Sequence, residues 1–235
     1  MKKLMTMALL ALCMTANANP MTEDEDNATK NGVVLDEKSN HDWTMHFAVG
    51  VNIPVDATNG YEFAPFRSWE FAWTVAQYDY HPKGASQTYS VGLGLNWRSY
   101  GLKDKDRLMM VKDPATDVIG LGIFPNNADN RSSNIHTAAI TMPLLFNQRI
   151  CKDFSLSVGA QLNWNVYGTL GNHYALGDDE IDMTTKDIKY RPFTVDVMAI
   201  AHIHGIGIYG KYSPMSVLKK NAGPEFKSVA VGIYF

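Results

Sequence analysis

The sequence predicts an all-β protein, an eight-stranded antiparallel up-and-down transmembrane β-barrel. Apolar and polar residues alternate with a period of two from residue 42 onward. Long and short connections alternate between these segments, and the apolar face is bulky whereas the polar face is rich in small residues. No run of 18 apolar residues is present, which excludes a transmembrane helix.

The composition limits the function classes. The chain has 235 residues, with 21 Lys and Arg against 24 Asp and Glu and a formal net charge of −3. Because there is no basic excess, we expect no nucleic-acid partner. Two cysteines, one of them near the N-terminus, exclude a disulfide scaffold. The length suits one domain of barrel size.

Residues 1–18 are expected to be a secretory signal peptide. Two lysines precede a mostly apolar stretch at residues 4–16, and an Ala-Asn-Ala cleavage pattern ends the segment. A lipoprotein leader acylated at Cys13 is the alternative, but Leu12 stands where a small residue is expected.

Residues 19–41 are expected to form a flexible acidic N-terminal tail, and residues 42–235 the outer-membrane β-barrel. Residues 23–26 are all acidic and apolar residues are few, which is typical of a solvated segment rather than of a core. An acidic docking segment is the alternative for this tail.

The first three strands are expected at residues 42–53, 69–76 and 89–98, where apolar residues occupy every second position. A fourth strand, at 134–150, has poorly separated faces because Leu144 and Leu145 are both apolar.

The fifth strand, at 154–166, is the clearest. Its seven alternate positions are all apolar, and the six between them are all polar or glycine, which no helical period produces. Three further strands are expected at 190–202, 205–213 and 226–235, of which the last two are short and rich in glycine.

The connections indicate the orientation of the barrel. We expect four long ones at about 54–66, 102–133, 171–187 and 214–225. We expect three short ones near 81–86, 151–153 and 203–204. In outer-membrane barrels the long loops are extracellular and the short turns periplasmic. The longest loop is the expected location of function and leaves open an extra hairpin around Val118–Phe124.

The bulky face should meet lipid, because small polar residues fit the narrow interior of an eight-stranded barrel and leave little lumen. The expected lipid-facing residues are Trp43, Phe47, Phe71, Trp73, Leu93, Trp97, Leu162 and Trp164.

Charged residues on the polar face need partners in the lumen. A turn centred on residues 203–204 sets Asp196 opposite Lys211, and a turn centred at residue 84 sets Glu70 opposite Arg98. We expect both pairs to lie within contact distance.

The chain resembles the small outer-membrane β-barrel (PorT-like) family of Bacteroidetes-type Gram-negative bacteria. Residues 140–146, Ile-Thr-Met-Pro-Leu-Leu-Phe, are similar to its "Ile-Pro-Leu-Leu" strand, and residues 154–163 to the strand that follows. Residues 209–214 and 223–226 are similar to its penultimate strand and last loop. The terminal strand ends in Phe235, similar to the C-terminal signal read by the outer-membrane barrel-assembly machinery. The resemblance implies an eight-stranded outer-membrane barrel and little about activity.

Two motifs have weak support. Residues 205–210 match GxGxxG literally, but a dinucleotide site needs a following helix, and the remaining residues alternate like strands. His202 and His204 could share a metal ion with His46 or Asp196, but zinc needs at least three ligands.

Three further patterns are also weak. Ser132, Ser133 and His136 suggest a hydrolase, but no orienting acid or oxyanion hole can be placed. The acidic residues 178–182 lack the spacing of a calcium loop. Residues 103–107 could contact lipopolysaccharide phosphates, although mixed charge is typical of a solvated loop. We therefore expect no catalytic residue, cofactor or metal site.

The expected function is that of an integral protein of the cell outer membrane, non-enzymatic, with a role in envelope structure, surface interaction, or assembly and secretion. A narrow porin-like channel and a lipid-modifying outer-membrane hydrolase are the alternatives. The expected partners are outer-membrane lipid and, through the C-terminal strand, the barrel-assembly machinery, while an extracellular partner is left open.

Overall fold

The computed structural model describes residues 40–83, 86–203 and 205–235. The predicted signal peptide and residues 19–39 of the predicted tail lie outside the described residues. His41, which the sequence analysis placed in the tail, is the first residue of β1. No helix among the described residues is both long and apolar enough to cross a membrane.

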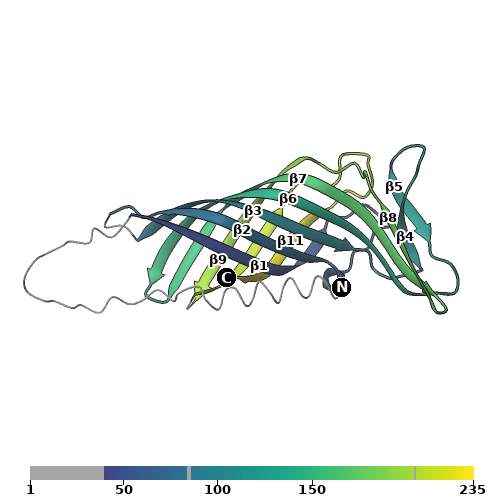
Figure 1. The fold of residues 1–235 in the computed structure, drawn as a ribbon, viewed down its shortest axis with the longest axis horizontal. Helices are drawn as coiled ribbons and strands as arrows, with labels where there is room; N and C mark the ends of the chain where they lie inside the picture. The colour runs from purple at the N-terminus through teal and green to yellow at the C-terminus, as the bar shows by residue number, and fades with distance from the viewer. Residues whose placement is uncertain (1–39, 84–85, 204) are drawn as a thin grey trace, which may run out of the picture.

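Eight antiparallel strands form a closed barrel, as the sequence predicts (Figure 1). Each strand pairs with the next along the chain, and the first strand pairs with the last. The barrel strands are β1 (His41–Val55), β2 (Trp69–Tyr80), β3 (Gln87–Gly101), β6 (Ala128–Cys151), β7 (Phe154–Leu176), β9 (Phe193–Ile203), β10 (Ile206–Ser213) and β11 (Lys227–Tyr234).

The connections alternate in length as predicted. Three short turns join β2 to β3, β6 to β7 and β9 to β10. The start of β1 and the end of β11 also lie at this short-turn end. Four long connections lie at the opposite, long-loop end, and the first of them contains the 3-10 helix η1 (Pro65–Arg67).

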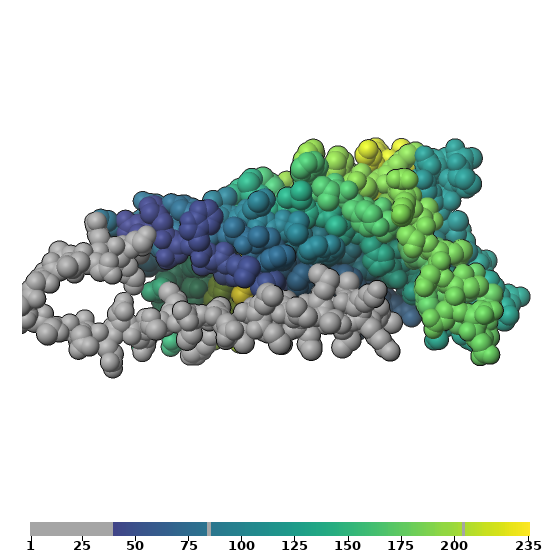
Figure 2. Space-filling model, in the orientation of Figure 1, coloured from purple at the N-terminus to yellow at the C-terminus, as the bar shows by residue number. Residues whose placement is uncertain are grey.

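The long-loop end contains more strand than the sequence analysis expected. Strands β6 and β7 continue through segments assigned to loops 102–133 and 171–187, and β8 (Asp179–Thr185) pairs with the end of β7. The β4 (Leu108–Lys112) and β5 (Ile119–Ile123) strands form a separate hairpin, which settles the question left open for this loop. These parts project from one end of the molecule (Figure 2). The extension was missed because polar residues occupy both faces of β6 there, so the period of two is lost.

A β-bulge in β2 changes which residues face the lumen. The pairing shifts by one residue between Thr74 and Ala76 against β3, and between Thr74 and Gln77 against β1. Beyond the bulge Gln77 and Asp79 are buried inside the barrel, whereas Tyr80 is exposed outside. The strand therefore continues four residues past its predicted end at residue 76, which the simple alternation did not show.

The outer wall of the barrel is apolar. Exposed large apolar side chains occur on all eight barrel strands, as at Val49, Val75, Leu93, Leu144, Val158, Val197, Ile208 and Val231. Polar side chains face inward, as at Asn52, Asn96, Thr141, Ser157, Asn163 and Ser213. This is the opposite of a soluble carrier barrel, whose apolar side chains fill the interior.

Candidate functional site: the barrel interior

The long-loop end of the barrel is closed by an apolar cap. Its buried residues come from the barrel rim and from three of the four long connections, and the first connection packs the partly buried Ala57, Tyr61 and Phe63 against them. They are Tyr100, Leu102, Met110, Ile119, Ile135, Leu170, Ile188, Val217, Leu218, Ala222 and Phe226. Since each connection contributes side chains to one core, the loops cover the lumen rather than surround an opening.

Aromatic packing and hydrogen bonds fix the cap. The Phe226 ring lies 4.6 Å from the Phe63 ring and 5.0 Å from the Tyr100 ring, measured between centroids. The Tyr61 hydroxyl donates to the Ile119 carbonyl oxygen at 2.9 Å. Burial raises the pKa of this tyrosine, which further favours the protonated, donating form of the hydroxyl.

Ion pairs at the surface of the cap lie between the first two long connections and within the β4–β5 hairpin. Hydrogen bonds from the ammonium groups of Lys105 and Lys103 hold the pKa of the Glu62 carboxyl below its ordinary value of 4.5. The hydrogen bond from Lys112, and its charge, similarly lower the pKa of Asp117 below 3.8. Residues 103–107 thus contribute to contacts within the cap.

A buried charge cluster fills the lumen beneath the cap. Glu70, Arg98, Asp196 and Lys211 are all at least nine-tenths buried. Arg98 Nε lies 3.0 Å from Glu70 Oε2, and a second guanidinium nitrogen pairs with Asp196. Lys211 Nζ lies 2.5 Å from Glu70 Oε1. Two acids and two bases leave the cluster formally neutral, which reduces the cost of burying charge.

The strand register gives one of the two predicted charge pairs and corrects the other. Glu70 stands opposite Arg98, as predicted. Lys211 stands opposite Met198 rather than Asp196, because the β9–β10 turn lies between Ile203 and Ile206, one residue further along than expected. Gly205 has a φ of +82° in this turn, a conformation that favours glycine. The register moves by two residues, so both charges remain inside but bind other partners.

Neutral side chains complete the cluster. Asn163 Nδ2 donates to Asp196 Oδ2 at 2.9 Å, and the Tyr209 hydroxyl donates to Glu70 Oε1 at 3.2 Å. Arg98 also donates to the Ser213 hydroxyl at 3.4 Å. The sequence analysis missed Tyr209 because it lies on a glycine-rich strand whose inward residues carry no obvious pattern.

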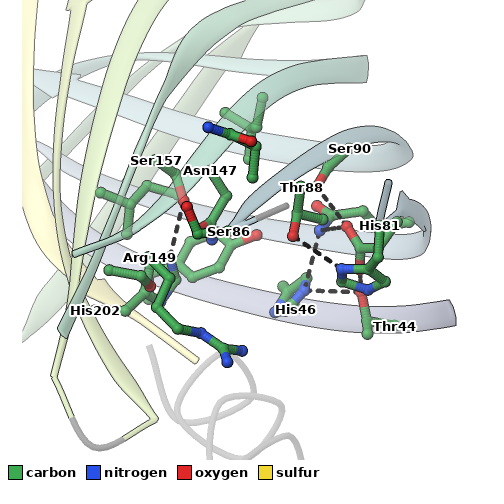
Figure 3. Close-up of a pocket in the computed structure, with 17 residues that line it drawn as sticks. Thr44, His46, His81, Ser86, Thr88, Ser90, Asn147, Arg149, Ser157 and His202 are labelled. Atoms are coloured by element: carbon green, nitrogen blue, oxygen red, sulfur yellow. Dashed lines mark hydrogen bonds between the residues drawn. The ribbon is translucent and has the colours of Figure 1, made fainter. Parts of the chain in front are cut away.

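The short-turn end, in contrast, contains a polar cavity of about 510 Å³ (Figure 3). Strands β1 to β3 form one wall with residues such as His46, Ser90 and Thr88, and β6, β7 and β9 form the other with Asn147 and Ser157. Figure 3 shows these two groups of side chains facing each other across the opening. The sequence analysis did not identify this cavity, because its β2 residues lie beyond the bulge.

The Asp79 carboxylate organises one wall of the cavity. Thr44 Oγ1 donates to its Oδ2 at 2.8 Å, Gln77 Nε2 donates to its Oδ1 at 2.9 Å, and the Ser90 hydroxyl also donates to it. Three donors from three strands therefore hold one buried carboxylate, which fixes the side-chain positions around it.

Two histidines flank a tyrosine at the floor of the cavity. The His46 ring stacks on the Tyr234 ring at 4.9 Å, and the His202 ring meets it edge-on at 5.7 Å. Across the described parts of the chain, no group of three or more His, Cys, Asp or Glu residues could hold a metal ion. His204, the other residue of the metal hypothesis, lies outside the described residues.

The predicted hydrolase residues do not come together. Ser133 is buried, and its hydroxyl accepts a hydrogen bond from the Met110 backbone nitrogen at 2.9 Å. His136 lies four residues after Ser132 on β6, where it stands opposite Thr169 on β7. The structure instead sets Ser132 opposite His173, whose Nδ1 lies 2.7 Å from Asp182 Oδ1.

This Ser–His–Asp alignment lies far from the apolar wall. His173 is nine residues beyond Trp164 on β7, or about 30 Å along the strand at ~3.3 Å per residue. Ser132, His173 and Asp182 line neither a cavity inside the barrel wall nor the apolar hollow around Leu162 on its outer face. A hydrolase needs a substrate pocket and an oxyanion hole as well as the three side chains, so the geometry gives no support to this alternative.

The two other motifs have structural locations. Residues 205–210 form a turn and strand β10, and no helix follows them in the described residues. Residues 178–182 belong to the start of β8 and its turn, where Asp182 contacts His173.

The predicted lipid-facing residues lie on the outer wall with different exposures. Trp43, Leu93, Trp164 and Leu162 are 73%, 58%, 52% and 38% exposed. Phe71, Trp73 and Trp97 are partly exposed. Phe47 is only 8% exposed and stacks on Trp73 at 5.8 Å, so it is less accessible than expected.

The C-terminal residue closes the barrel. Phe235 exchanges two backbone hydrogen bonds with Phe47, at 3.0 and 2.8 Å, and its carbonyl oxygen lies 3.1 Å from His46 Nδ1. The last residue of the chain is therefore part of the strand ladder rather than a free end.

No protein-family model and no curated protein sequence matches the chain. Among solved structures the chain is similar to Ail, the attachment invasion locus protein of Yersinia pestis. The identity is 12% and the TM-score 0.34, over 83% of this chain and 99% of that chain. Likeness at this level carries no argument about function, so an assignment to a membrane depends on the barrel geometry.

Proposed function

We propose that this chain is an integral outer-membrane protein with a closed, non-conducting lumen, non-enzymatic, whose contacts with the envelope and the cell surface are made at its two ends. The observation that carries the proposal is the combination of an apolar outer wall with an interior closed by the cap and the charge cluster. In hydrocarbon an unpaired backbone group costs several kcal/mol, so a closed barrel is one of the two structures that can span a membrane.

The height of the outer wall fits a bilayer. On β7 the outward apolar residues run from Phe154 to Val166, a separation of twelve residues (166 − 154) or about 40 Å at ~3.3 Å per residue. At a strand tilt of ~40° this covers roughly 30 Å, which is enough for the apolar band of about 25 Å in outer-membrane barrels.

Aromatic side chains lie near both ends of this wall. Trp43 contacts Tyr78, and Tyr89 contacts Phe146, near the short-turn end, whereas the Trp164 ring stacks on Phe193 nearer the long-loop end. Such pairs are typical of the aromatic girdles at the two membrane surfaces.

A shallow apolar hollow on the outer wall also fits lipid. It has a volume of about 290 Å³ and is lined by residues such as Leu93, Met142, Leu162 and Trp164. An acyl chain lying along the barrel would fill such a hollow without burying any charge.

The orientation follows from the connections. Long loops are extracellular and short turns periplasmic in bacterial outer-membrane barrels, so the cap would face the cell surface and the polar cavity the periplasm. The predicted signal peptide agrees with export to the outer membrane. The terminal Phe235 agrees with insertion there by the barrel-assembly machinery. The resemblance to the PorT-like family supports the same assignment through the sequence motifs alone.

A channel is the alternative, and the closed interior disfavours it. Eight strands leave an interior that side chains can fill, and here the charge cluster and the apolar cap occupy it in series. A solute would have to displace both layers to cross.

Membrane insertion is tested first by extraction and electrophoresis of the full chain expressed with its leader in a Gram-negative host. We expect it to remain with outer membranes through alkaline washing, to need detergent for release, and to migrate faster before heating than after. Release by alkali without detergent would contradict the membrane assignment.

The closed lumen is tested by planar-bilayer recording of the purified protein. We expect no stable conductance steps. Reproducible ohmic steps would overturn the closed-lumen proposal and favour the porin-like alternative, while leaving the membrane assignment intact.

A further inference from the structure

The polar cavity at the short-turn end has the size and the enclosure of a ligand site. Its volume of about 510 Å³ lies in the range of small-molecule pockets, roughly 300–1,000 Å³. Buried Leu145, Ile200 and Tyr234 separate it from the charge cluster, so it is a pocket with a floor rather than the mouth of a channel.

The lining is rich in neutral hydrogen-bonding groups. Seven hydroxyl side chains, three amides and three histidines line the cavity, against one carboxylate and one guanidinium. The carboxylate, on Asp79, already accepts hydrogen bonds from Thr44, Gln77 and Ser90. Opposite formal charges cancel, so the lining favours an uncharged ligand that both donates and accepts hydrogen bonds.

One buried acceptor in the wall has no partner. Gln77 is 6% exposed, and its Oε1 atom has no hydrogen-bond partner among the described residues. The amide cannot be reversed, because Nε2 must donate to the Asp79 carboxylate at 2.9 Å. A buried acceptor is normally satisfied. Because the Oε1 atom itself is fully buried, a ligand in the cavity reaches it only after a small turn of the Gln77 side chain, which lines that cavity.

This acceptor discriminates between classes of ligand. A phosphate dianion or a carboxylate has no proton to donate to Gln77 Oε1, and the nearby Asp79 would repel it. A polyhydroxylated ligand can donate to the amide oxygen from one hydroxyl and accept from serine, threonine and asparagine side chains with others.

The opposite wall supplies such groups in fixed positions. Asn147, Ser155 and Ser157 line it, and the Ser157 hydroxyl lies 3.3 Å from His202 Nε2. On the first wall His46 Nε2 lies 3.0 Å from the Thr44 hydroxyl. A ligand between the walls would therefore meet donors and acceptors on both sides.

From this geometry we propose that the cavity binds an uncharged saccharide of one or two sugar units. The proposal stands on the cavity alone and does not depend on whether the barrel lies in a membrane. In the orientation proposed above, the saccharide would enter from the periplasm.

The test is isothermal titration of the purified full chain, refolded in a detergent without a sugar headgroup, because glycoside detergents would compete. The probes are glucose, N-acetylglucosamine and maltose, with glucose 6-phosphate as the anionic counterpart of the first. We expect at least one neutral sugar to bind, and the phosphorylated sugar to bind at least about tenfold more weakly than glucose.

Gln77→Leu is the matched variant, since it removes the unpaired acceptor at similar volume. It should weaken binding of the neutral sugar about tenfold or more, because losing a hydrogen bond to a buried group costs roughly 1.4 kcal/mol or more. Asn127→Leu, which also replaces an amide by leucine but at an exposed position of the long-loop end, should leave binding unchanged.

Folding of each variant is checked by its heat-modifiable migration. If Gln77→Leu does not fold, Ser157→Ala on the opposite wall replaces it, with the expectation of a several-fold loss. The proposal is overturned if no neutral sugar binds with a Kd below about 10 mM. Glucose 6-phosphate binding as tightly as glucose, or Gln77→Leu and Ser157→Ala both leaving binding intact, would overturn it equally.

Discussion

The two ends of the barrel differ in how the interior is completed. At the long-loop end, four connections contribute apolar side chains to one core that covers the lumen. At the short-turn end, the connections are too short to reach over the opening, and polar strand residues surround a cavity of about 510 Å³. The strands are continuous between the ends, so the difference comes from the connections.

The difference between the two ends indicates that the length of the connections determines where this barrel contains a cavity. A long connection has enough residues to pack apolar side chains against the neighbouring connections, as Tyr61, Ile188 and Phe226 do. A short turn between two strands cannot do so. The polar residues left at the mouth must then satisfy one another, as Thr44, Gln77 and Asp79 do.

The largest expected effect is at the boundary between the two ends. Arg98→Met removes the cation that pairs with Glu70 and Asp196, and leaving buried carboxylates without it should lower the free energy of unfolding by about 3–5 kcal/mol. Urea titration of the folded protein in lipid vesicles measures this. Arg131→Met, which removes a more exposed pair with Asp104, should cost about 0–1 kcal/mol. Equal losses for the two variants would refute the role of the cluster.

The next effect compares the ends directly. Leu218→Ala in the cap deletes a side chain that is 0% exposed and should cost about 2–5 kcal/mol. Ser155→Ala at the cavity wall should change stability by no more than about 0.5 kcal/mol. The same urea titration applies, with limited proteolysis of the long loops as a second reading. A cap variant as stable as the wild type would show that the loops do not form a core.

A smaller effect tests the outer wall that both ends share. Ala160→Arg places a charge at the middle of the apolar band on β7 and should cost about 2–4 kcal/mol in lipid vesicles. Tyr167→Arg, also on the outer face but beyond Trp164, should cost about 0–1 kcal/mol. If the two changes cost the same, the depth assigned to the band is wrong.

The smallest effect is the pH dependence of the cap. The pKa values of Glu62 and Asp117 are lowered by their lysine partners, so their ion pairs contribute stability above the ordinary values of 4.5 and 3.8. That contribution is lost as the pH falls from these values through the lower folded-state pKa values. Hydrogen exchange of the loop amides should therefore show more frequent opening below about pH 4.5, once corrected for intrinsic rates. Glu62→Gln should remove part of the dependence, and an unchanged profile in that variant would contradict the assignment.

Alternation along the chain was sufficient to predict the fold, because a half-exposed strand has a period of two. The segment from Phe154 to Trp164 shows it most clearly. Even the ambiguous pair Leu144 and Leu145 resolves simply, since the first is exposed outside and the second is buried against the cavity floor.

The interior could be predicted only in part, because small local events change it. One bulge in β2 exchanged the faces of the residues that form the cavity wall. Moving the β9–β10 turn by one residue shifted every partner by two, which separated Asp196 from the position opposite Lys211. A bulge changes the phase of the alternation but not its period, and a shifted turn leaves every residue on its original face, so a search for the period alone detects neither.

The outward orientation of the bulky side chains is tested most directly by tryptophan fluorescence in lipid vesicles. The chain has five tryptophans, and all lie at outward positions of the strands: Trp43, Trp69, Trp73, Trp97 and Trp164. We expect vesicles of lipids brominated in the acyl chains to quench most of the emission, while acrylamide in the water quenches little of it. Emission that is insensitive to the brominated lipids and quenched by acrylamide would contradict the membrane assignment.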